Sequence, residues 1–174
     1  MLSGNSLRNR DWIQHTEHQF AGLFDDYYVQ NYAHWDSGEE WIDLPHELTV
    51  LTEKAPDFSH PYGVFAKSIG TVLALQATQK DIIKPMFMLF CGLPLGYINE
   101  KYETFKKDLE AYEGKVVIIH NQHDTVGDAE AVKAYLGDVV DGSRVAFIDA
   151  PGDSHDYEDY LILMSELSML RESA

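Results

Sequence analysis

The sequence predicts an α/β fold: a doubly wound, all-parallel six-stranded sheet with helices on both faces. Along the 174 residues, short runs rich in β-branched and aromatic residues alternate with longer stretches in which apolar residues recur at helical spacing. Residues 116–120 are apolar almost throughout, which is typical of a strand buried on both faces of a parallel sheet. Because parallel strands need crossover connections, the alternation itself favours helices packed on both faces.

Each predicted element has its own pattern. The six strands are predicted at residues 1–3, 27–32, 64–65, 85–91, 116–120 and 145–148. Tyrosine is the commonest residue of the second strand, whereas valine and isoleucine dominate the fifth. Helices are predicted from apolar spacing over residues 12–23, 44–55, 71–75, 102–112, 132–135 and 157–170. No composition change marks a linker, so residues 1–174 are expected to form a single domain.

Composition narrows the class of partner. The chain is 45% hydrophobic and 24% charged, with a formal net charge of −16, which argues against nucleic acid and anionic membranes as partners. Cys91 is the single cysteine, so no internal disulfide is possible and a reducing compartment is expected. With neither a signal-peptide pattern at the N-terminus nor an apolar run of about 20 residues, a cytoplasmic location is predicted.

Polar residues follow three of the predicted strands. Ser68, Asp124 and His155 stand after the third, fifth and sixth strands, and the carboxyl ends of parallel strands share one edge of the sheet. Ser68 is flanked at two residues' distance by Ala66 and Gly70, as expected of a tight strand-to-helix turn that exposes the hydroxyl.

Several alternatives stay open at this stage. Ser68 could be a structural turn residue, but a phosphate-binding loop is excluded because Pro61 and Ala66 stand where its two glycines are required. Asp124 could cap the following helix, and Asp128 is then the alternative acid.

Other polar residues are expected to be structural. The pairs His15/His18 and His120/His123 lack a third ligand, so no metal and no cofactor are predicted. Cys91 is expected in the core, Lys67 pointing away from the reaction centre, and His34, Trp35 and Trp41 in packing or a pocket wall.

Together these motifs resemble the α/β-hydrolase fold family, specifically its small members that lack a lid domain. Residues 66–70, Ala-Lys-Ser-Ile-Gly, resemble the nucleophile elbow, usually G-x-S-x-G, with alanine replacing the first glycine. Residues 120–126 resemble the segment that carries the acid, and residues 152–155 the loop that carries the histidine. Residues 3–5, Ser-Gly-Asn, resemble the His-Gly-x turn. The resemblance spans nearly the whole chain and implies a minimal fold without the family's first two strands.

The resemblance implies a serine hydrolase with a Ser-His-Asp triad and an acyl-enzyme intermediate. Ser68 would be the nucleophile, His155 its base and Asp124 the residue that orients His155. The backbone N–H groups of Ile69 and Asn5 would form the oxyanion hole.

The only indication of the substrate's size is the number of residues available to cover the site. Only residues 93–113 are available to cover the site, so it is expected to be open and to take a small-molecule acyl substrate: an ester, thioester or amide. Two alternatives stay open, an acyltransferase using the same triad and a non-catalytic binding protein that retains the fold. The sequence predicts neither the acyl-chain length nor the oligomeric state.

Overall fold

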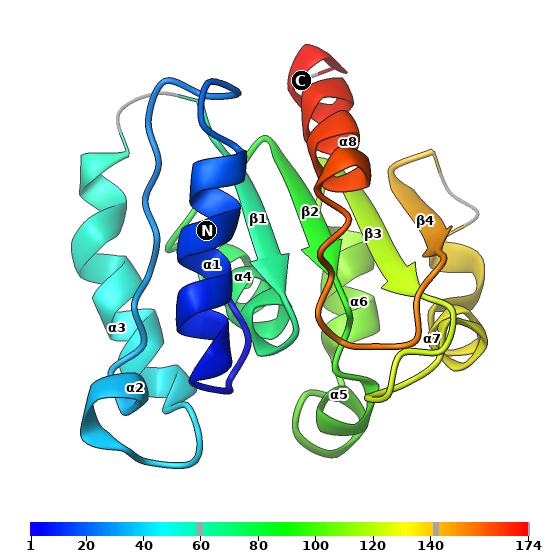
Figure 1. Cartoon of the computed structure of the whole chain (residues 1–174), viewed down its shortest axis with the longest axis horizontal. Coiled ribbons are helices and arrows are strands. Elements are labelled where there is room, and N and C mark those ends of the chain that lie inside the picture. Colours follow the sequence, from blue (N-terminus) through cyan, green and yellow to red (C-terminus); the bar gives the residue numbers. More distant parts are fainter. Residues whose placement is uncertain (59–60, 141–142, 174) are drawn as a thin grey trace.

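The structure, a computed structural model that describes residues 1–58, 61–140 and 143–173, confirms an α/β architecture with a parallel sheet and helices on both faces (Figure 1). Within the described residues, one parallel sheet is formed by β1 (Gly63–Lys67), β2 (Phe87–Cys91), β3 (Lys115–Asn121) and β4 (Val145–Ala150). The strands lie side by side in chain order, β1-β2-β3-β4, so each helical crossover connects direct neighbours.

The sheet therefore has four of the six predicted strands, and the two N-terminal strands are corrected. Leu2 forms an isolated parallel bridge with Ala66 beside β1, through hydrogen bonds from Leu2 N to Phe65 O (2.9 Å) and from Lys67 N to Leu2 O (3.0 Å). Residues 27–32 are irregular, although Gln30 N donates to Met1 O (3.1 Å). A strand needs pairing that repeats along the backbone, and here each pairing stops after one residue.

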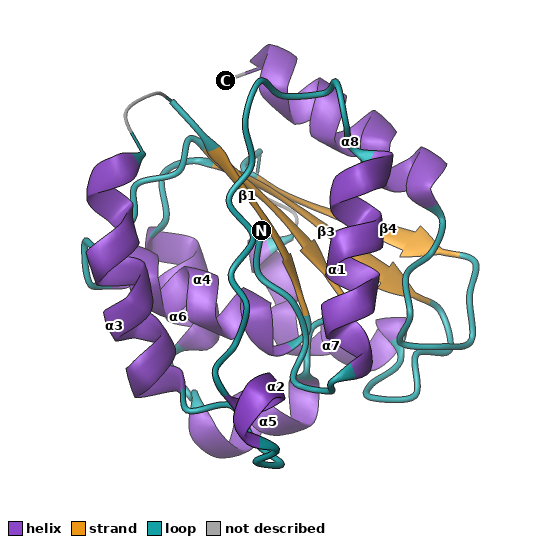
Figure 2. Ribbon diagram, turned by 60° about the vertical axis from the view of Figure 1, so that its left-hand side comes forward, coloured by secondary structure: helices purple, strands orange, loops and turns teal. Residues whose placement is uncertain are grey.

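Helices cover both faces of the sheet (Figure 2). One face is covered by α1 (Arg8–Gln19) and α8 (Tyr160–Ser173), and the other by α3 (Leu44–Lys54), α4 (Ile69–Gln79), α6 (Phe105–Ala111) and α7 (Ala129–Leu136). Two short helices, α2 (His34–Ser37) and α5 (Leu95–Lys101), lie at the end toward which the strands point. Short 3₁₀ turns, η1 (Ala55–Asp57) and η2 (Gly137–Val139), extend α3 and α7.

The core explains why these segments were predictable. Every residue of β2 is buried, so the strand is apolar on both of its faces. In α8 the buried residues Leu163, Leu167 and Leu170 form one stripe at helical spacing, and each such burial stabilises the fold by about 1.5–3 kcal/mol.

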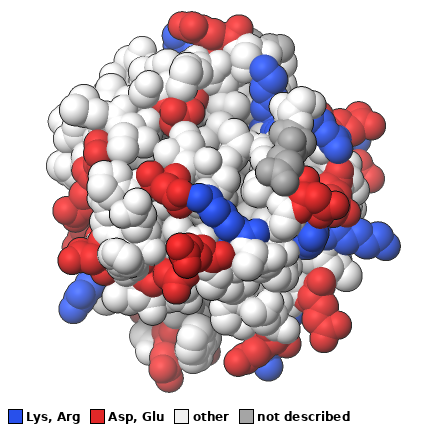
Figure 3. Space-filling view, turned by 90° about the vertical axis from the view of Figure 1, so that its right-hand side faces the viewer, with Lys and Arg blue, Asp and Glu red and all other residues white. Residues whose placement is uncertain are grey.

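Acidic residues outnumber basic ones in this protein. The chain has 29 Asp and Glu residues against 13 Lys and Arg. On the face seen in Figure 3 the acidic side chains are spread over the surface rather than gathered in one patch. Among the described helices, none is long and apolar enough to cross a membrane.

Candidate active site

Ser68 occupies the turn between β1 and α4 in a strained conformation. Its φ of 53° and ψ of −126° lie in a region that non-glycine residues rarely adopt. The backbone is fixed on both sides, because Ser68 N donates to Cys91 O (2.9 Å) and Ser68 O accepts from Thr71 N (2.9 Å) and Thr71 Oγ1 (2.7 Å). The side chain is partly exposed, and its hydroxyl forms no hydrogen bond with any described residue.

A close approach behind Ser68 requires a small residue. A Cβ on Gly70 would lie 2.7 Å from the carbonyl carbon and oxygen of Leu2 and 2.7 Å from Ser3 O. The first turn of α4 therefore packs directly on the backbone of the N-terminal segment. This contact places the turn at residues 3–6 beside Ser68.

Asp124 and His155 are in direct contact. His155 Nδ1 lies 2.7 Å from Asp124 Oδ2 and 2.9 Å from Oδ1. The buried carboxylate also accepts hydrogen bonds from Tyr157 Oη (2.6 Å) and Val126 N (2.8 Å). Burial by itself raises the pKa of Asp124, but the hydrogen bonds and the imidazole outweigh it and lower the pKa below its ordinary value. Asp124 is therefore ionised near neutral pH.

This contact defines the protonation of His155. Because Nδ1 donates to the carboxylate, the neutral ring carries its lone pair on Nε2. That atom is buried and has no hydrogen-bond partner within the described part of the chain.

His155 and Ser68 both lie against the end of β2. A Cβ on Gly92 would lie 2.8 Å from His155 Cε1, and the preceding residue, Cys91, binds Ser68 N through its carbonyl. The structure thus joins Asp124 to His155 and places Ser68 at the neighbouring strand end. Within the described residues no hydrogen bond joins Ser68 to His155.

The alternative acid, Asp128, has a different position. It is the N-cap of α7, and its Oδ1 accepts a hydrogen bond from Ala131 N (2.7 Å). The capping role considered for Asp124 therefore belongs to Asp128, and Asp124 is the carboxylate that contacts His155.

Asn5 is held by all its polar groups except one. Its side chain donates to Glu40 O (2.8 Å) and accepts from Ile42 N (2.7 Å). Its carbonyl accepts hydrogen bonds from His34 Nε2 (2.6 Å) and Trp35 Nε1 (3.0 Å). The Asn5 N–H has no acceptor among the described residues.

The backbone N–H of Ile69 also lacks an acceptor among the described residues. Ile69 is the first residue of α4, where backbone N–H groups lack partners within the helix. Both N–H groups predicted for the oxyanion hole are thus unused.

Tyr157 lies elsewhere than the sequence predicts, whereas His34 and Trp35 are packed as predicted, against a partner that the sequence does not predict. Tyr157 was predicted to begin the last helix, but it lies in the preceding loop with a φ of 52°, and its hydroxyl contacts Asp124 and Asn121 N (3.0 Å). His34 and Trp35 are buried and bind Asn5, about 30 residues away in the chain. Local spacing carries no signal of such distant contacts.

Among residues 1–58, 61–140 and 143–173, no group of three His, Cys, Asp or Glu side chains could hold an ion. Both nitrogens of buried His120 bind the backbone, at Gly127 O (2.6 Å) and Leu93 N (3.3 Å), and burial lowers its pKa.

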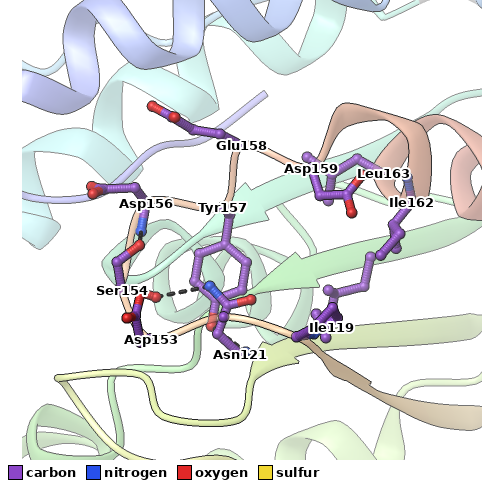
Figure 4. Close-up of a pocket in the computed structure, with 13 residues that line it drawn as sticks. Ile119, Asn121, Asp153, Ser154, Asp156, Tyr157, Glu158, Asp159, Ile162 and Leu163 are labelled. Atoms are coloured by element: carbon purple, nitrogen blue, oxygen red, sulfur yellow. Dashed lines mark hydrogen bonds between the residues drawn. The ribbon is translucent and has the colours of Figure 1, made fainter.

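Two hollows are lined by residues other than Ser68 and His155. One, of about 190 Å³, lies beside the His155 loop, and its wall includes Asn121, Tyr157 and Glu158 (Figure 4). A wider one, of about 670 Å³, lies between α3, α4 and α6. Neither is lined by Ser68 or His155.

No protein-family model and no curated protein matches the chain. Solved structures do match. The esterase domain of a Rhodothermus marinus protein aligns with a TM-score of 0.65 at 11% identity, over 99% of this chain and 84% of that one. A serine hydrolase without a lid from Xanthomonas campestris aligns at 0.59 and 14% identity, over 99% and 80%. Est1E of Butyrivibrio proteoclasticus, solved with ferulic acid bound, aligns at 0.67 and 14% identity, over 99% and 86%.

Proposed function

We propose that this chain, which has the α/β-hydrolase fold, is a serine hydrolase that cleaves small esters, thioesters or amides with Ser68, His155 and Asp124. The observation that carries the proposal is the Asp124–His155 pair, whose unpartnered Nε2 lies at the strand end next to the strained Ser68 turn. Esterases and a serine hydrolase among the structural neighbours support it. We propose that residues 1–174 act as one domain, in the cytoplasm.

The proposed reaction proceeds in two halves. Ser68 Oγ attacks the acyl carbon while His155 Nε2 takes its proton, and Asp124 stabilises the resulting imidazolium. The negative charge on the carbonyl oxygen is bound by the N–H groups of Ile69 and Asn5. His155 then protonates the leaving group, which leaves an acyl-Ser68 ester. Water, deprotonated by His155, attacks this ester and releases the acid.

Small substrates fit the proposal best. Residues 93–113 contain only α5 and α6, and α6 packs on α4, so little chain is left to cover Ser68. Neither of the two hollows is lined by Ser68, so neither offers a long acyl chain a place beside this serine. An acyltransferase would use the same residues, with an alcohol or amine in place of water.

The first experiment tests Ser68 directly. Intact protein is treated with a fluorophosphonate and its mass is measured. We expect one adduct on Ser68 in the wild type, none in Ser68→Ala or His155→Ala, and a normal adduct in Ser37→Ala, which alters an exposed serine. Folded wild type that stays unlabelled would overturn the proposal and favour a non-catalytic binding protein.

A second experiment tests the substrate class. p-Nitrophenyl esters from acetate to laurate are compared by kcat/KM, with and without an added alcohol acceptor. We expect the short esters to be preferred. A strong preference for laurate would contradict the open site, and faster turnover with transfer to the alcohol would identify an acyltransferase.

A further inference from the structure

Lys67 is a buried ammonium group without a carboxylate partner. It is the last residue of β1, directly before Ser68, and is 3% exposed. Its Nζ donates to Asn9 Oδ1 (2.7 Å) and lies 4.6 Å from the centre of the Trp12 ring. No described carboxylate lies within ion-pair distance of it. Burying such a charge is unfavourable, and a nonpolar side chain of similar size would fold more easily here.

Asn9 connects this lysine to the turn that contains Asn5. It lies in the first turn of α1 and is 8% exposed. Its amide packs so closely on Gly4 that a Cβ there would lie 2.6 Å from Asn9 Nδ2. The Asn9 backbone binds the same turn, accepting from Ser3 Oγ (3.2 Å) and donating to Ser6 O (2.8 Å). Asn9 therefore contacts residues on both sides of Asn5.

The lysine determines which way the Asn9 amide faces. An ammonium group can only donate, so the amide oxygen must point to Lys67 and the NH₂ group toward Gly4. The charge also strengthens this hydrogen bond compared with a neutral donor. With the amide reversed, its oxygen would face the Gly4–Asn5 backbone and two donors would meet at Lys67.

We propose that Lys67 and Asn9 are positioning residues for the oxyanion hole, acting together to hold the Gly4–Asn5 peptide so that the Asn5 N–H faces the acyl oxygen. This inference rests on the proposed serine hydrolase. Neither residue touches the substrate: Lys67 orients Asn9, and Asn9 packs on the turn. The loss expected on breaking the pair is in the rate of the chemical step, because the oxyanion forms only in the transition state.

The main test is Lys67→Met, with Lys115→Met as the control at an exposed position of the same sheet. We expect kcat on p-nitrophenyl acetate to fall roughly 10- to 100-fold, which is somewhat less than the fall that follows the complete loss of an oxyanion-hole donor. KM should change little. The melting temperature should stay equal or rise, because a buried unpaired charge is removed. Lys115→Met should match the wild type.

The coupling between the two residues provides an independent test. Asn9→Ala should lower kcat to a similar degree, and the double variant should be no worse than the more damaged single one, because both changes remove one positioning contact. Losses that multiply would show that the two act separately and would overturn the inference. Weaker binding of phenylboronic acid, which places an oxygen in the oxyanion hole, should accompany each loss of kcat.

Dependence on pH gives a further readout. Burial lowers the pKa of Lys67 to about 8, although Asp156, Cys91, Asp124 and Glu158 act to raise it. The wild-type kcat should therefore decline as Lys67 loses its proton above pH 8. Lys67→Met should lack this decline, and Asn9→Asp, which supplies a counter-charge, should move it to higher pH.

The outcomes separate this inference from the proposed function. A wild type that neither reacts with the fluorophosphonate nor cleaves esters overturns both. A wild type that does both, with Lys67→Met unchanged in kcat, overturns only the positioning role. A parallel fall of kcat and melting temperature in Lys67→Met would show a merely structural lysine.

Discussion

At the scale of single residues, the candidate site contains strained backbone conformations that neighbouring contacts must stabilise. Ser68 and Tyr157 are two non-glycine residues with positive φ, at 53° and 52°. Such conformations cost about 1–3 kcal/mol each and persist only where neighbouring contacts hold them. Ser68 is held by Cys91 and Thr71, and Tyr157 by Asp124 and Asn121. These two strained residues lie in the turn that contains Ser68 and in the loop that contains His155.

Tyr157→Phe tests the support of Asp124. The change keeps the ring but removes a hydrogen bond to the carboxylate and leaves Asn121 N–H without its acceptor. We expect a loss of about 1.5–3 kcal/mol in the free energy of unfolding at pH 7. Turnover should fall by roughly tenfold, because His155 is then less well oriented. Tyr28→Phe, at a half-buried tyrosine whose hydroxyl bonds to no described residue, is the control.

The pH dependence of stability follows from the same contact. The folded pKa of Asp124 lies below its ordinary value of 3.8, so its stabilising contribution is present above that value and disappears as the pH falls through the lower folded pKa. Removing the Tyr157 hydroxyl raises the folded pKa. Urea unfolding between pH 2.5 and 5 should therefore show a smaller loss of stability on acidification in Tyr157→Phe. An identical pH dependence would contradict the role of this hydrogen bond.

Asp124→Asn and Asp128→Asn form a matched pair. In Asp124→Asn the imidazole loses the carboxylate that orients it, and kcat should fall by about 10⁴-fold. Asparagine caps a helix about as well as aspartate, so Asp128→Asn should keep both turnover and stability. Ester hydrolysis and thermal unfolding measure the two effects. The opposite pattern would exchange the two assignments.

At the scale of elements, a strand could be predicted from the sequence where many consecutive residues share one burial pattern. β2 and β3 were predictable because each contains a continuous run of buried apolar residues. The N-terminal segments were predicted as strands but pair over one residue each, and single contacts leave no periodic pattern. The order of Ser68, Asp124 and His155 along the strand ends was readable, whereas Lys67–Asn9 joins residues 58 positions apart. Such contacts depend on packing between elements.

The junction of α4 with the N-terminal segment gives a test at this scale. Gly70→Ala would place a Cβ 2.7 Å from the Leu2 and Ser3 backbone, so α4 or the Asn5 turn must move. We expect a loss of about 1–3 kcal/mol in stability and a large fall in kcat, since both Ser68 and Asn5 are displaced. Gly96→Ala is the control: nothing lies within 4 Å of its Cβ, and alanine favours the helix α5. Equal effects of the two changes would exclude the close contact as the cause.

At the scale of the whole molecule, the net charge of −16 should disfavour anionic substrates of the proposed hydrolase before any contact is made. Exposed Asp153, Asp156, Glu158 and Asp159 lie within four residues of His155, so the negative potential extends to the site itself. An anionic ester is repelled as it approaches, whereas a neutral ester of the same size is not. The repulsion acts over a Debye length of about 10 Å at 0.1 M salt and is therefore reduced by added salt.

Varying the ionic strength distinguishes electrostatic repulsion of the substrate from its contacts in the site. We expect kcat/KM for p-nitrophenyl hydrogen succinate to lie well below that for p-nitrophenyl butyrate in 10 mM buffer. The difference between the two kcat/KM values should become smaller as the NaCl concentration rises to 0.5 M, while kcat/KM for the neutral ester changes little. Glu158→Gln should make this difference smaller at low salt, because it removes one of the nearby charges. If the ratio of the two esters stays constant across this range, preference arises from contacts at Ser68 rather than from the acidic surface.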